Sequence, residues 1–294
     1  MLSLGKLSVM GHRRVATVVI LPSLAECRLC PGPGQRNALD VISDFDPFHK
    51  HLTFMAPLSE DRADRLIRFL AGGPAGEIVD IGCGWGELLL RVVASSHDLH
   101  GTGIDTDGDA IAQAQQLATE RRLADRITLI VGDAKADLAQ NAASAVCIGA
   151  SQAWASTDTV DEPLDYGLAL RSLRGIVHPG GRVVYGEGIW SAPPTAEAIA
   201  PLAGRLDEFV TFAELVELAV SSNFMPVAFH EASLDEWDIF ESGYSARYAT
   251  WLARHPGDHP DAQEVRDLAR KQRAANLGGY RGILGMAYLE LVAT

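Results

Sequence analysis

Three glycines in the stretch VDIGCGWGE, residues 79–87, have the spacing Gly82-x-Gly84-x-Gly86 and follow a short apolar run. Glycine adopts positive φ readily and lets the backbone lie within contact distance of a ligand. Loops that cradle a pyrophosphate at a helix N-terminus have the longer spacing G-x-G-x-x-G. Here a carboxylate, Asp80, precedes the loop by two residues, which suits a ligand with an ammonium group better than a phosphate. The pattern predicts a small-ligand site, with a tight turn that binds nothing as the alternative.

A second acid follows in the stretch GIDTDGDAIAQA, where Asp105 ends the next apolar run. An acid at the end of the second strand of a doubly wound sheet accepts hydrogen bonds from the two ribose hydroxyls of a nucleoside, and it excludes a 2′-phosphate. The alternative is that Asp105 merely sits beside a helix N-cap provided by Thr106 or Asp107. We favour ribose binding.

A third acid, in Gly132-Asp133-Ala134, follows the next apolar run. A carboxylate at this place accepts a hydrogen bond from an exocyclic amine such as that of adenine. Its alternative role is again a helix N-cap.

These residues need elements that bring them to one edge of a sheet. Apolar runs predict strands, and amphipathic or alanine-rich runs with capping residues predict helices. We expect strands at 77–81, 101–105, 127–131, 143–148 and 182–186, and helices at 59–70, 87–94, 107–122 and 165–177. Strands that alternate with helices indicate a mostly parallel sheet covered on both faces.

Four motifs together, VDIGCGWGELLLRVV, GIDTDGDAIAQA, VGDA and HPGGRVVYGEG, resemble those of class I S-adenosylmethionine-dependent methyltransferases. The resemblance covers residues 77–190. It implies an α/β fold with a Rossmann-like, doubly wound, seven-stranded and mostly parallel sheet of order 3-2-1-4-5-7-6. It also implies that the last strand is antiparallel and that the cofactor is S-adenosyl-L-methionine.

The same resemblance implies roles for individual residues. Asp80 would lie near the methionine ammonium, directly or through water, and the glycines would lie against the cofactor. Asp105 would bind the ribose and Asp133 the adenine, which Thr106 and Ala134 would flank. The expected cofactor-binding residues are Asp80, Gly82, Cys83, Gly84, Gly86, Asp105, Thr106, Gly132, Asp133, Ala134 and Ser151.

The C-terminal third completes this plan, with a helix at 212–222 and strands at 225–230 and 283–292. Two further helical patterns, at 234–254 and 261–275, lie in a connection that is longer than a hairpin needs. We expect a methyltransferase domain at 43–294 with a helical cap over the site, formed by lid segments at 43–70 and 234–280. Residues 1–42 would be a flexible extension that ends near the Pro- and Gly-rich stretch PGPG.

Methyl transfer requires alignment of the reacting atoms and removal of any proton on the nucleophile. Glu187, beyond the fifth expected strand, is the candidate base or cation stabiliser; its alternative roles are an arginine partner or a helix cap. The candidate substrate-binding residues, each with an alternative role in the core or on the surface, are Gln152, Trp154, Trp190, Tyr244, Tyr280 and His51. No Cys-x-x-Cys or His-rich cluster lies near the expected site, so a metal-dependent mechanism is not supported.

Composition narrows the class of substrate. The 294 residues carry 25 Lys and Arg against 38 Asp and Glu, a formal net charge of −13. Nucleic acids and anionic membranes need clustered positive charge, so neither is the expected partner. We expect a cytoplasmic enzyme that methylates O, N or C of a small molecule, for example in natural-product tailoring; a homo-oligomer is left open. The alternatives are a nicotinamide-dependent oxidoreductase, disfavoured by the glycine spacing and Asp80, and a non-catalytic adenosylmethionine-binding protein.

The first forty residues allow two other interpretations. A basic start, an apolar middle and Leu-Ala-Glu-Cys27 loosely resemble a signal peptide, but Glu26 does not fit its cleavage box. Cys27-x-x-Cys30 would be half of a zinc site, but no second half follows at a suitable spacing. We prefer the extension.

Overall fold

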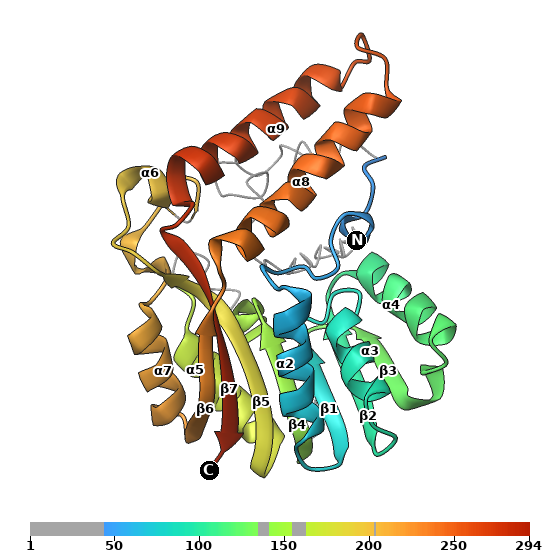
Figure 1. Cartoon of the computed structure of the whole chain (residues 1–294), viewed down its shortest axis with the longest axis vertical. Coiled ribbons are helices and arrows are strands. Elements are labelled where there is room, and N and C mark those ends of the chain that lie inside the picture. The colour runs from blue at the N-terminus through green and yellow to red at the C-terminus, as the bar shows by residue number, and fades with distance from the viewer. Residues whose placement is uncertain (1–43, 135–140, 155–162, 203) are drawn as a thin grey trace, which may run out of the picture.

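The computed structural model describes residues 44–134, 141–154, 163–202 and 204–294, so the expectations for residues 1–42 lie outside the described residues. One seven-stranded sheet forms the centre, with the order β3-β2-β1-β4-β5-β7-β6 (Figure 1). Its strands are β1 (Gly76–Ile81), β2 (Leu99–Asp105), β3 (Ile127–Val131), β4 (Ala142–Ile148), β5 (Val177–Trp190), β6 (Phe224–Glu231) and β7 (Leu284–Ala293). The predicted strand order is confirmed.

Strands β1 to β5 are parallel neighbours, and β7 runs antiparallel to both β5 and β6. The carboxyl ends of the parallel strands therefore share one edge, which faces the cap at the top of Figure 1. Crossover helices cover the strands, so their sequences are continuous apolar runs rather than alternating ones.

Helices connect the strands and cover both faces of the sheet. The longer ones are α2 (Glu60–Ala71), α3 (Glu87–Ala94), α4 (Gly108–Glu120), α5 (Tyr166–Ile176), α7 (Phe212–Ser221), α8 (Leu234–Arg254) and α9 (Ala262–Ala275). Shorter turns are η1 (Phe48–Lys50), η2 (Ala124–Arg126), η3 (Ser151–Trp154), α6 (Ala196–Ile199), η4 (Leu206–Glu208) and the π-helical η5 (Asn276–Tyr280). No helix in the described part of the chain is both long enough and apolar enough to cross a bilayer.

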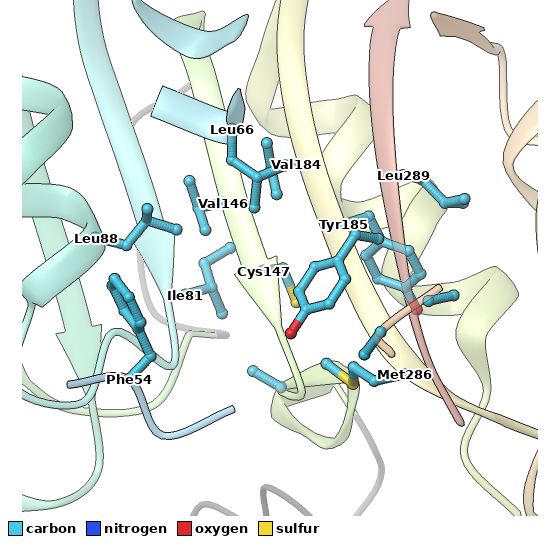
Figure 2. Close-up of a cluster of buried hydrophobic side chains, with 14 of the residues drawn as sticks. Phe54, Leu66, Ile81, Leu88, Val146, Cys147, Val184, Tyr185, Met286 and Leu289 are labelled. Atoms are coloured by element: carbon cyan, nitrogen blue, oxygen red, sulfur yellow. The ribbon is translucent and has the colours of Figure 1, made fainter. Parts of the chain in front are cut away.

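Alternate residues of β5 identify the two layers of helices. The guanidinium of Arg182 lies 5.0 Å from the centre of the Phe69 ring of α2. Tyr185, three residues further along the strand, points to the opposite face, where α5 begins with the buried Tyr166. Figure 2 shows Leu66 of α2 above Val184, on the face away from the Tyr185 ring.

Strand β5 is longer than the sequence pattern predicted. It was expected at 182–186 but extends to Trp190, because β7 pairs with it from Arg182↔Val292 to Trp190↔Leu284. Glu187 therefore lies inside the strand, not beyond it. The expectation of a loop residue was wrong because pairing with a distant strand is not visible in the local pattern.

The cap consists of α8, α9 and η5, and it stands over the carboxyl edge of the sheet (Figure 1). The two long helical patterns were predicted within one residue of their observed bounds. Of the other expected lid segment, 43–70, the part from residue 60 onward belongs to α2, which packs on α3 and the sheet. Ser59 caps α2 as expected, accepting the amide of Arg62. We call residues 44–58, which run between the cap and the sheet, the roof segment.

Candidate functional site

The glycine loop, residues 82–86, joins β1 to α3, and its three glycines all adopt left-handed conformations. Their φ angles are +71° at Gly82, +53° at Gly84 and +72° at Gly86. A Cβ on Gly82 would lie 2.5 Å from the Cβ of Ala150, whereas a Cβ on Gly84 would meet nothing within 4 Å. Gly82 therefore allows close packing inside the protein. Gly84 faces open space, where a ligand can approach the backbone.

Asp80 is a buried carboxylate at the end of β1 without a described partner. It is 5% exposed, and no hydrogen bond or ion pair to it is found among the described residues. Burial, with the nearby charge of Asp105, raises its pKa to about 7. An unpaired buried charge costs free energy, and a bound cation would offset that cost.

Asp105, at the end of β2, organises the loop next to it. Its Oδ2 accepts the Gly84 amide at 2.8 Å and its Oδ1 accepts the Asp107 amide at 2.9 Å. Burial raises its pKa. Asp107, not Asp105, caps α4 by accepting the amides of Asp109 and Ala110. The amide of Thr106 also donates to this carboxylate. A carboxylate has about four acceptor positions, so Asp105 can still accept a hydrogen bond from the ribose.

Residues 132–134 lie beside Asp105, because β3 pairs with β2 up to Asp105↔Val131. The amide of Gly132 donates to the Asp105 carbonyl at 2.9 Å. Asp133 is exposed and Ala134 is buried. Thr106, between the two strand ends, has a buried hydroxyl with no hydrogen-bond partner among the described residues. Sequence reasoning placed these residues around adenine, and the structure brings them together.

A cleft lies between the glycine loop and the roof segment. Its floor contains Asp80 among largely apolar groups, and its roof is the stretch Phe54–Leu58. The lining residues are Phe54, Met55, Ala56, Leu58, Asp80, Gly82, Cys83, Gly84, Trp85, Glu87, Leu88, Val146 and Ile148. Figure 2 shows Phe54 beside Leu88 and Ile81 at this end of the sheet. Burial raises the pKa of the Cys83 thiol well above its usual value, so the thiol stays protonated and unreactive.

Two hydrogen bonds fix the roof. The indole of Trp85 donates to the Thr53 carbonyl at 3.0 Å, and the hydroxyl of Tyr288 donates to the Pro57 carbonyl at 2.9 Å. The expected lid segment 43–70 includes Phe54–Leu58, but none of these side chains was named as a site residue. Their only signal was a short apolar run, FMAPL, directly before the cap of α2.

Glu187 is buried and lies under the turn that follows β4. Its Oε1 accepts the amide of Ser151 at 2.8 Å and its hydroxyl at 2.5 Å. Burial raises its pKa to about 7 despite these bonds. The predicted neighbour Trp190 is buried three residues further along β5, where its indole donates to Leu206 and packs edge-on against Phe209. Trp190 does not line the cleft, so its predicted substrate role gains no support.

The remaining candidates divide between two places. Gln152 and Trp154 are half-buried in η3, which begins at Ser151. Neither lines the cleft, so their substrate role stays a prediction. Tyr244 packs between Phe48 and Phe240 inside the cap.

Two candidates lie further from the cleft. Tyr280 donates to Glu241 of α8 at 2.8 Å. His51 faces Asp46, with Nε2 3.5 Å from the carboxylate. Tyr244, Tyr280 and His51 are absent from the lining of the cleft. Tyr244 joins the cap to the roof segment, whereas Tyr280 bonds within the cap and His51 faces Asp46 within the roof segment.

The arrangement fits S-adenosyl-L-methionine. Asp80 can pair with the ammonium of the methionine, Gly84 leaves room at the backbone, and Asp105 can accept a hydrogen bond from the ribose. The buried hydroxyl of Thr106 has no partner in the described part of the chain. The cofactor, when bound, supplies a methyl group on a sulfonium, which is a good leaving group. The chain has to orient the two reactants and keep water out.

Comparison with known proteins agrees with this geometry. Residues 78–181 match the methyltransferase domain family. The chain is 31% identical over 213 residues to the uncharacterised protein YjhP of Escherichia coli K12, a match that covers 71% of this chain and 82% of YjhP. The chain belongs to the class I S-adenosyl-L-methionine-dependent methyltransferases.

Solved structures place it within that class. A methyltransferase from Geobacter sulfurreducens, crystallised with S-adenosyl-L-homocysteine, superposes with a TM-score of 0.72 at 27% identity and covers 84% of this chain and 96% of that one. A Thiobacillus denitrificans methyltransferase with the same ligand gives 0.71 at 25% identity, covering 84% and 96%. The YjhP structure gives 0.70 at 27% identity, covering 84% and 98%. The protein is thus an S-adenosyl-L-methionine-dependent methyltransferase, not a nicotinamide-dependent oxidoreductase.

Proposed function

We propose that this methyltransferase acts on a small molecule, at an oxygen, nitrogen or carbon atom. The observation that carries the proposal is the roof: residues Phe54–Leu58 cover the same cleft that Asp80 and Gly84 line. A covered cleft leaves little room for a polymer beside the cofactor. The formal net charge of −13 also disfavours nucleic acid as the substrate.

The apolar lining supports the same proposal. Apart from Asp80 and Glu87, the cleft presents apolar side chains and backbone, and Glu87 is engaged by Arg91 and Arg121. A compact apolar pocket with few polar groups is the usual form of a small-molecule site. Natural-product tailoring is one role that such a pocket would serve.

A labelled-methyl assay tests the proposal. The purified full chain is incubated with S-adenosyl-L-methionine carrying a labelled methyl group, and with panels of phenols, amines, enolisable ketones, nucleic acids and proteins. We expect transfer to a small-molecule panel, and reduced transfer with Asp105→Ala at a cofactor concentration that does not saturate the variant. Transfer to nucleic acid or protein alone would overturn the proposal and leave the family assignment intact.

A further inference from the structure

Glu187 is the first member of a chain of contacts that ends at the cofactor loop. Its carboxylate accepts both the amide and the hydroxyl of Ser151. The hydroxyl of Tyr185 lies 2.7 Å from the same Ser151 oxygen. Because Ser151 donates its proton to Glu187, Tyr185 donates to Ser151. These bonds fix Ser151, the last residue of the turn 149–151.

The turn 149–151 packs against the glycine loop. The amide of Gly149 continues the sheet by donating to the Gly186 carbonyl at 2.7 Å. Ala150 packs closely against Gly82. A Cβ added to Gly82 would lie only 2.5 Å from the methyl carbon of Ala150. A shift of Ala150 toward the loop would therefore displace Gly82, the loop residue between Asp80 and Gly84.

The surroundings of Glu187 are those of a structural acceptor. Its described donors are the hydroxyl of Ser151 and the amides of Ser151, Ala150 and Gly188, and no arginine or lysine contacts it among the described residues. It lies on the α5 face of β5, with Cys147 and Tyr185. The β4 residues that line the cleft, Val146 and Ile148, point to the other face.

We propose that Glu187 and Ser151 are positioning residues, which hold the turn 149–151 against Gly82 and so set the shape of the methionine end of the cofactor site. The inference rests on the family and its cofactor, not on the identity of the substrate. It differs from a role for Glu187 as a base, because a base alone would leave the affinity for the cofactor unchanged.

The first test measures the affinity of the full chain for S-adenosyl-L-homocysteine by calorimetry, which requires no substrate. Glu187→Leu removes every acceptor and should weaken binding about tenfold, since one hydrogen bond to a charged group is worth about a factor of ten or more. Glu187→Gln keeps one acceptor oxygen and should recover part of the loss. Ser151→Ala should weaken binding roughly threefold. Wild-type affinity in all three variants overturns the proposal and favours the base.

A matched control is Glu290→Gln, on the neighbouring strand β7. Glu290 is also buried, with a pKa raised by burial. It lies opposite Val184 in the middle of the sheet and opposite Ala228 of β6, away from the turn. Its replacement should leave the affinity unchanged; a loss equal to that of Glu187→Gln overturns the proposal, because burial of any acid would then explain the effect.

A second test asks whether Glu187 acts through Ala150. Ala150→Gly removes the methyl group that faces Gly82 and keeps the bonds of Glu187. If the contact transmits the effect, the losses in Ala150→Gly and Glu187→Gln will not multiply in the double variant. If the two losses of affinity multiply in the double variant, Glu187 does not act through Ala150, and the proposal is overturned. This test also stands if Glu187→Leu fails to fold.

Discussion

Asp80 and Glu236 are both buried carboxylates, yet their surroundings are opposite. Asp80 is 5% exposed and Glu236 is 6% exposed. Asp80 has no described partner and its pKa is raised to about 7. The side chain of Glu236 accepts Arg62 Nε and Nη2, both at 2.8 Å, and the pKa of the carboxyl is held well below its usual range by Arg62 and the hydroxyl and amide donors around it.

The difference separates a binding site from a structural link. Ser59 and Ser233 add amide and hydroxyl donors to Glu236, so the starts of α2 and α8 are joined through one carboxylate. All the charge of Glu236 is compensated inside the protein. Asp80 is left for compensation from outside, by a cationic ligand. Two equally buried carboxylates can therefore have different roles. Their hydrogen-bond and ion-pair partners determine whether each one binds a ligand or links parts of the fold.

The largest effect is expected where the compensated pair is broken. Arg62→Ala leaves Glu236 buried without its cation, and loss of one partner of a buried pair costs about 3–5 kcal/mol. Urea unfolding followed by circular dichroism should show a fall of that size in the free energy of unfolding. Arg281→Ala is the control. It breaks the exposed pair with Asp238, which lies on α8 like Glu236, and it should change stability little. Similar losses in both variants would contradict the comparison.

The uncompensated carboxylate should make cofactor binding depend on pH. The cationic ligand binds ionised Asp80, so affinity for S-adenosyl-L-homocysteine should fall about tenfold per pH unit below about 7, since the pKa of Asp80 is about 7. Calorimetry between pH 5.5 and 7.5 measures this slope. Asp80→Asn should flatten it. A steep slope retained in Asp80→Asn would assign the titration to another group.

The same carboxylate should lower the stability of the ligand-free protein. The pKa of Asp80 is about 7 in the folded chain against an ordinary value of 3.8, so between these values the folded state binds more protons. Its contribution to stability is then lost as pH rises from about 4 to about 7. Asp80→Asn should therefore be more stable than the parent at pH 8 without ligand. Thermal unfolding with and without ligand measures the difference, and lower stability in the variant would refute this account.

Asp105 lies between these two cases: the backbone amides of Gly84, Thr106 and Asp107 donate to it, and it keeps some acceptor capacity for a ligand. Asp105→Ala should weaken cofactor binding by about 1–3 kcal/mol, through lost charge-assisted hydrogen bonds to the ribose. Calorimetry with S-adenosyl-L-homocysteine measures the loss. Asp107→Ala, which removes the cap of α4 but not the ribose acceptor, is the matched control. Unchanged affinity in Asp105→Ala would remove its ribose role.

The cofactor half of the site was largely predictable from sequence, because its information is local. Gly82, Gly84 and Gly86 are next to the strand they follow, and Asp105 ends the next strand in the chain. Parallel strands bring such ends to one edge whatever the rest of the fold does. The glycine spacing and the acids at the ends of the strands, taken together, therefore indicated where the loop lies.

The contacts of the cap, the roof segment and the end of β5 were not predictable, because they join distant parts of the chain. Glu236 meets Arg62 across 174 residues, and nothing near either residue indicates the pair. Tyr244 was a candidate for substrate binding or for the core, and its ring packs edge-on against Phe48 of the roof segment. Glu187 was expected beyond its strand, but β7 extends the strand past it. Helix patterns predict that a cap exists, and they do not show which side chains it buries.

The smallest effect is expected at Trp85, where the glycine loop meets the roof segment. Its indole donates to the Thr53 carbonyl of the roof segment, so Trp85→Phe should leave that carbonyl without its partner and cost about 0.5–1.5 kcal/mol. Trp237 supplies the control: its indole nitrogen is buried without a partner among the described residues, so Trp237→Phe changes volume but breaks no described hydrogen bond. Calorimetry should show weaker binding of S-adenosyl-L-homocysteine in Trp85→Phe only. Equal binding in both variants would mean that the roof segment covers the cleft without help from this hydrogen bond.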